Sequence, residues 1–102
     1  MGLSATFQLG SPEQAQAQLN RDLALFLREQ GPWKRFTVPA IPGSQGLRDK
    51  IDRGGASNVL FTDGDYSYVV GRFVLRGGTG AGQATNAAIH LYNRVHGAAV
   101  CP

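Results

Sequence analysis

A glycine-rich passage has the composition of an anion-binding loop. Residues 77–82 read Gly-Gly-Thr-Gly-Ala-Gly and lie between a segment with strand character and one with helix character. Such a loop can present backbone N–H groups and the positive end of a helix to a phosphate or carboxylate. It lacks the Lys-Ser/Thr of a P-loop and the spacing of a dinucleotide fingerprint. We therefore expect a plain strand-to-helix connection, with anion binding beside Arg76 as the alternative.

Histidine, aspartate and serine side chains do not form a catalytic or metal-binding pattern. His90 and His96 are six residues apart, whereas two metal ligands on one helix are typically about three or four residues apart. Asp63 and Asp65 flank a glycine, as turn residues do. Ser44 directly follows a glycine and lacks the Gly-x-Ser-x-Gly pattern of a nucleophile elbow. We therefore predict no catalytic residue, no cofactor and no metal, and favour a protein that is not an enzyme.

Aromatic and cationic side chains are better suited to contacting a partner. Trp33 is next to two cationic residues just beyond a predicted helix end. It is expected either to pack against the end of the core or to bind a ligand together with Arg35. Tyrosines at positions 66 and 68 share one face of their strand. A histidine on the second helix is expected at the surface. The predicted binding surface consists of Trp33, Arg35, Tyr66, Tyr68, Arg72, Arg76 and His90.

The N-terminal half is predicted to hold one helix between short strands. Residues 4–9 alternate between polar and apolar types, the pattern of a half-buried strand. A Ser-x-x-Gln capping box at residues 11–14, with proline at the first helical position, predicts a helix that runs to about residue 30. Two prolines limit the next strand to residues 36–38. The charged segment 47–53 is expected to be a mobile surface loop or a helical turn.

The C-terminal half is predicted to form a hairpin and a second helix. The hairpin has Asp63-Gly64 as its turn. This turn places Phe61 opposite Tyr66 in an aromatic ladder. Apolar positions then predict a helix over about residues 83–96. The order strand, helix, strand, hairpin, helix favours an α+β fold, a two-layer sandwich of one antiparallel sheet with both helices on one face, which leaves the other face for a partner.

Composition indicates one small domain over residues 1–102, either a whole protein or a fragment of a longer chain. Charged residues make up 17% of the chain, against about 25% in an average domain. The net charge of +3 comes from scattered cations, so nucleic acid is not an expected partner. Apolar runs are too short for membrane insertion. The single cysteine, Cys101, excludes an internal disulfide, and its role is left open.

Three segments carry a resemblance to a protein family. They are the Pro-Gly-Ser turn of residues 41–44, the hairpin over residues 58–71 and the closing-helix residues 91–95. Over residues 36–96 the chain resembles uncharacterised exported proteins and lipoproteins of actinobacteria. The resemblance implies an extracytoplasmic α+β domain and supplies no active-site residue. The first residues do not read as a signal peptide, so a cytoplasmic location stays open.

The favoured function is a non-enzymatic binding or interaction module of an exported bacterial protein. Its partner is expected to be another protein or a second copy of the chain, and a small-molecule ligand is compatible with this prediction. The alternative is a small dimeric α/β-barrel enzyme or ligand carrier of the ferredoxin-like type, with a site in the cleft between sheet and helix. His90, Tyr68 and Arg72 would supply the polar groups of that site.

Overall fold

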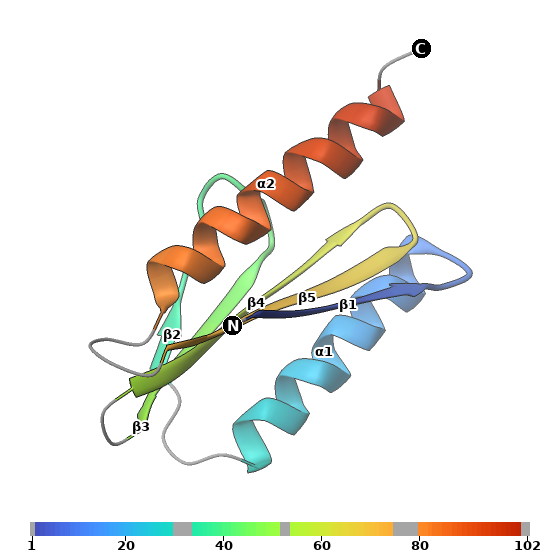
Figure 1. Cartoon of the computed structure of the whole chain (residues 1–102). Coiled ribbons are helices and arrows are strands. Elements are labelled where there is room, and N and C mark those ends of the chain that lie inside the picture. Colours follow the sequence, from blue (N-terminus) through green and yellow to red (C-terminus); the bar gives the residue numbers. More distant parts are fainter. Residues whose placement is uncertain (1, 30–33, 52–53, 75–79, 101–102) are drawn as a thin grey trace.

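The structure, a computed structural model, describes residues 2–29, 34–51, 54–74 and 80–100. Over these residues the chain forms one antiparallel sheet and two helices (Figure 1), which confirms the predicted α+β class. In chain order the elements are β1 (Gly2–Gln8), α1 (Pro12–Glu29), β2 (Lys34–Phe36), β3 (Gln45–Ile51), β4 (Gly54–Asp63), β5 (Tyr66–Val74) and α2 (Ala81–Val100).

The sheet has the strand order β1-β5-β4-β3-β2, and every neighbouring pair is antiparallel. The hairpin of β4 and β5 lies towards the middle, while β1 and β2 are the edge strands of the described sheet. These two edges lie far apart in space although only α1 separates them along the chain. As a consequence, β1 has a described neighbouring strand on one side only.

The two helices cover opposite faces of the sheet, so the expectation that both share one face does not hold (Figure 1). On β5, Tyr68 and Val70 belong to the cluster that includes Ala88 of α2, whereas Val69 lies with Phe26 of α1. Successive side chains of a strand point to opposite faces, which places the helices on either side. The fold therefore has three layers, with the sheet between two helices.

The reason for this arrangement lies in the central strands, which are apolar on both faces. Residues 59–61 are Val-Leu-Phe, and each is 0% exposed. Consecutive apolar residues of this kind are typical of a strand that is covered on both sides. The tyrosine face of the sheet is therefore covered by α2 and is not left open for a partner.

The start of α1 follows the predicted capping box. The Gln14 N–H donates to Ser11 Oγ at 3.2 Å, and Gln14 Oε1 accepts a hydrogen bond from the Gly10 N–H at 2.7 Å. These bonds satisfy amide groups near the helix start that have no intrahelical partner. Ala15 and Leu19 on the inner side of α1 are buried, and the helix packs on β4 and β5.

The charged segment 47–53, described as far as residue 51, is a strand instead of the expected loop or helical turn. β3 pairs with β2 on one side and β4 on the other, and Leu47 within it is fully buried. Gly46 lies under the ring of Phe36, where a Cβ would come within 2.5 Å of the ring. The preceding strand occupies residues 34–36, two residues earlier than predicted. The segment forms a strand because it pairs with a strand on each side, in spite of its charged residues. No local sequence pattern indicates such pairing.

The hairpin turns one residue later than predicted. Its two-residue loop is Gly64-Asp65, with Gly64 at a φ of +60°. Phe61 consequently lies opposite Tyr68 and not opposite Tyr66. A shift of two residues along the partner strand keeps every side chain on its predicted face. The aromatic ladder therefore forms, with ring centroids 4.8 Å apart between Phe61 and Tyr68.

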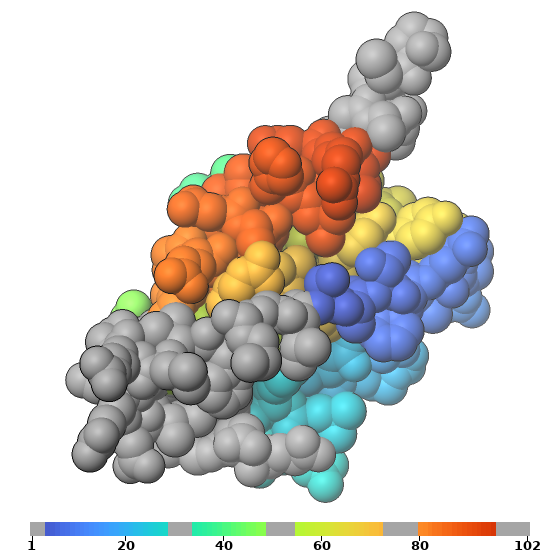
Figure 2. Space-filling model, in the orientation of Figure 1, coloured from blue at the N-terminus to red at the C-terminus, as the bar shows by residue number. Residues whose placement is uncertain are grey.

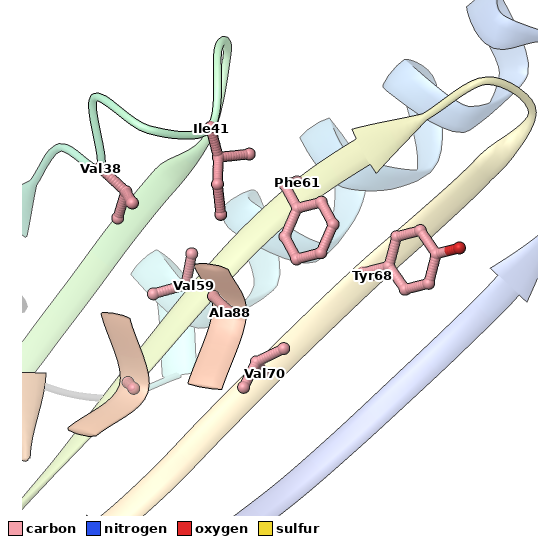
Figure 3. Close-up of a cluster of buried hydrophobic side chains, with 8 residues drawn as sticks. Val38, Ile41, Val59, Phe61, Tyr68, Val70 and Ala88 are labelled. Atoms are coloured by element: carbon pink, nitrogen blue, oxygen red, sulfur yellow. The ribbon is translucent and has the colours of Figure 1, made fainter. Parts of the chain in front are cut away.

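One core cluster lies between the sheet and α2, as Figure 3 shows. Phe61 and Tyr68 lie side by side on the two hairpin strands, and Ala88 of α2 packs over the same face (Figure 3). The buried members of the cluster are Val38, Ile41, Val59, Phe61, Tyr68, Val70, Ala84 and Ala88. The first two come from the loop between β2 and β3, so this loop belongs to the core.

α2 is longer at both ends than predicted and runs from Ala81 to Val100. Gly97, which follows the predicted helix end, lies inside it. Residues 98–100 are therefore helical, at the place where the ferredoxin-like alternative requires a further strand. The described fold does not support that alternative.

Candidate interaction surface

The structure does not bring the predicted binding residues together. Arg35 lies on the edge strand β2 and donates to Gln45 Oε1 at 2.6 Å. Arg72 lies on β5, half-buried, and donates to the Gly71 carbonyl oxygen at 3.0 Å. His90 is exposed on α2. These residues lie on three different elements and form no common site among themselves.

Trp33 and Arg76 lie outside the described residues, as do residues 77–79 of the predicted anion loop. The described end of that loop leads directly into α2. Gly80 has a φ of +78°, and its carbonyl oxygen accepts a hydrogen bond from the Ala84 N–H at 2.9 Å. Gly80 therefore accepts the first helical hydrogen bond of α2, and both the plain connection and anion binding beside Arg76 stay predictions.

Tyr68 packs in the core, and Tyr66 is half-buried against it, with ring centroids 6.1 Å apart. Tyr68 is 6% exposed, and burial, followed by the charge of Asp63, raises the pKa of its phenol. Tyr92 of α2 meets Phe61 edge-on, with ring centroids 5.7 Å apart. The cleft predicted between sheet and helix is therefore filled by aromatic rings where Tyr68 was expected to face a ligand.

A groove of about 280 Å³ lies at the other helix, between α1 and the sheet edge formed by β1. We name it the β1–α1 groove. None of the predicted binding residues lines it. Its lining residues are Ala5, Phe7, Val69, Asp22, Leu25 and Phe26. Five of these six are apolar, so the groove is suited to holding apolar groups of a partner.

The rim of the groove carries large apolar side chains in contact with solvent. Phe7 is 41% exposed and Leu25 is 48% exposed, although both side chains line the groove. Figure 2 shows β1, in blue, at the surface next to α1, in cyan. The cause is the position of α1, which packs mainly on β4 and β5 and covers the edge strand only in part.

One carboxylate interrupts the apolar lining. Asp22 Oδ1 accepts a hydrogen bond from Gln18 Nε2 at 2.9 Å, whereas Asp22 Oδ2 is buried and has no hydrogen-bond partner among the described residues. A buried acceptor without a donor is unfavourable by about 1–3 kcal/mol. The groove is therefore suited to an incoming N–H or O–H group as well as to apolar ones.

Sequence reasoning missed this groove although part of its signal was present. Alternation assigned Phe7 to the apolar side of a strand, and helical spacing made Phe26 part of the apolar stripe of α1. Leu25 falls outside that stripe. The run Leu-Ala-Leu-Phe-Leu at residues 23–27 is wider than one buried stripe requires, and this excess was the available signal.

The part of the chain that the structure describes contains neither a cluster of metal-binding side chains nor a helix that could span a membrane. No three His, Cys, Asp or Glu side chains come together there as a metal site would require. No described helix is long and apolar enough to cross a membrane.

We also compared the chain with protein-family models, curated proteins and solved structures, and none of them matches it.

Proposed function

We propose that this chain is a non-enzymatic interaction module that binds a partner protein at the β1–α1 groove. The observation that carries the proposal is the apolar lining of the groove together with the exposure of Phe7 and Leu25. Single exposed apolar side chains are common on any protein, whereas contiguous ones mark interaction sites. The proposal moves the contact surface from the tyrosine face of the sheet to its β1 edge.

Burial of the two rim side chains would contribute useful binding free energy. Full burial of a Leu or Phe side chain contributes about 1.5–3 kcal/mol. Phe7 and Leu25 are each close to half exposed, so covering them leaves roughly 1 kcal/mol or slightly more to gain at each residue. A contribution of about 1 kcal/mol or more is found at only a minority of the residues in a protein interface.

The proposal includes a location. The resemblance over residues 36–96 supports a module of an exported actinobacterial protein. Immunodetection in cell-envelope, culture and cytoplasmic fractions of the source cells tests this part. We expect the protein in the first two fractions, and finding it only in the cytoplasm would contradict the location but not the binding surface.

A phage-displayed peptide library tests the binding surface. We expect panning against the wild-type protein to enrich peptides with apolar side chains, and Leu25→Glu to weaken their binding by about tenfold in fluorescence polarisation, equivalent to about 1.4 kcal/mol. Leu27→Glu is the matched control, because Leu27 lies on the same helix with 43% exposure but does not line the groove. Equal effects of the two substitutions, or no enrichment, would contradict the proposal.

A ligand carrier that uses the same groove is the second candidate, favoured by the unpartnered Asp22 Oδ2. Its ligand would be an apolar molecule with one amine. Titration with phenethylamine and with ethylbenzene, followed by NMR shifts of residues lining the groove, distinguishes the two candidates. A carrier binds the amine more tightly and loses that preference in Asp22→Asn. Binding of neither molecule would eliminate the carrier and leave the protein-binding proposal standing.

A further inference from the structure

We infer that the partner is a second copy of this chain, whose β1 pairs antiparallel with β1 across a two-fold axis. This inference rests on the proposed function, since the pairing uses the same edge of the molecule as the β1–α1 groove. The sheet would continue from one copy into the other, with α1 of both copies on one face and α2 of both on the opposite face.

The open edge of β1 has unused hydrogen-bonding groups. The Leu9 N–H, just after β1, donates to the Asp65 carbonyl oxygen at 2.8 Å, which shows that this residue directs its backbone towards β5. In an antiparallel strand, successive residues direct their backbone groups to alternate sides. Ser4, Thr6 and Gln8 therefore direct N–H and C=O groups away from β5, to the side where the described sheet has no further strand.

Among the described residues, those of β1 carry none of the sequence features that normally protect an edge strand. Exposed edges are commonly blocked by lysine, proline or a β-bulge. The seven residues Gly2–Gln8 contain no charged residue and no proline, and their pairing with β5 runs without interruption. Residues 4–8 are all exposed. A second strand can therefore approach without steric or charge opposition from β1 itself.

The sequence of β1 is complementary to itself when the two-fold axis passes at Thr6. In that register Thr6 faces Thr6 of the second copy, and Phe7 faces Ala5 of the second copy. A large and a small apolar side chain then meet twice on the α1 face, and both residues line the groove. On the other face, Ser4 meets Gln8, and the threonine pair is a favourable cross-strand combination. One register thus pairs the outward backbone groups and covers the exposed Phe7.

Charge reversal at the axis tests the dimer. Thr6→Glu and Thr6→Lys each place two like charges opposite each other in the homodimer, and each should raise the dimer dissociation constant by about tenfold. An equimolar mixture in which one variant carries a heavy-isotope label should regain a dimer that native mass spectrometry identifies as mixed. The Thr6 side chain points away from the groove, because it lies on the opposite face from Phe7. The same substitutions at exposed Thr37 are the matched controls and should leave the dimer unchanged.

Sedimentation velocity of the wild type across concentrations provides the baseline, and circular dichroism confirms that each variant is folded. A monomeric wild type, or a dimer indifferent to both charges at Thr6, would overturn the inference. If peptides found by panning still depend on Leu25 in that case, the proposed function survives alone. A mixed dimer accompanied by peptides that ignore Leu25 would instead support the β1 pairing and contradict the groove.

Discussion

Replacement of Ser67 by alanine should stabilise the protein, although substitutions in a core usually destabilise it. Ser67 is 0% exposed on β5, and its hydroxyl has no hydrogen-bond partner among the described residues. Its backbone pairs with Phe7, so its side chain lies on the face that α1 covers. A polar group in this setting has left water without gaining a partner.

The expected gain is about 1 kcal/mol. A buried hydroxyl without a partner is unfavourable by about 1–3 kcal/mol, and alanine removes that term while keeping Cβ. The void left by the lost oxygen atom is unfavourable by about 1 kcal/mol and offsets part of that gain. For a domain of this size, a net gain of about 1 kcal/mol raises the melting temperature by roughly 4 °C or more.

Urea unfolding of Ser67→Ala and Ser44→Ala is the decisive assay, because the chemical change is identical at both positions. Ser44 is 9% exposed, but its hydroxyl donates to the Val38 carbonyl oxygen at 3.2 Å. Its loss should destabilise the fold by about 1 kcal/mol. With a denaturant slope of about 1–3 kcal/mol/M, the two midpoints should separate by roughly 1 M. Midpoints that move in the same direction, or a Ser67→Ala protein less stable than wild type, would refute the reasoning.

Three further predictions concern the packing of the core. Burial and the nearby Asp63 raise the pKa of Tyr68, so its contribution to stability is full below about pH 10 and is lost as pH rises through the folded-state pKa. Urea unfolding at pH 8 and pH 11 should show a smaller alkaline loss in Tyr68→Phe than in wild type, and equal losses would contradict this. Phe61→Leu should lower the free energy of unfolding, measured with urea at pH 7, by about 2 kcal/mol, because Phe61 is 0% exposed and contacts two aromatic rings. A loss below about 0.5 kcal/mol would count against that packing. Gly46→Ala should lower the melting temperature, because its Cβ would lie 2.5 Å from the Phe36 ring, and Phe36→Leu in the same chain should recover part of the loss.

Elements set by local chemistry were predictable from the sequence. The start of α1 depends on a capping box within residues 11–14, and the structure contains its hydrogen bonds. The hairpin was predicted on the correct faces but with Phe61 against the wrong partner. A two-residue hairpin loop of this kind needs a positive φ, and Gly64 can supply it at either of the two loop positions. The two resulting registers place the same side chains on the same faces of the sheet, so the sequence did not distinguish them.

Features that depend on distant parts of the chain were not predictable. The charges of residues 48–50 concealed a strand that exists because β2 and β4 flank it. Tyr68 is of a residue type that is common at contact surfaces, but it lies under α2. No local sequence pattern specifies which face of the sheet α2 covers. Phe7 follows the alternation of a buried strand yet is 41% exposed, because α1 packs mainly on the inner strands and covers the edge only in part. The candidate surface arises from that offset.

Residue-resolved amide hydrogen exchange at low and high protein concentration tests the β1 edge as the recognition surface most directly. Our account predicts that the Ser4, Thr6 and Gln8 amides exchange more slowly as the concentration rises, because they become paired with a second copy. The Ala5 and Phe7 amides, already directed towards β5, should change far less. Exchange at Ser4, Thr6 and Gln8 that is independent of concentration would contradict the account.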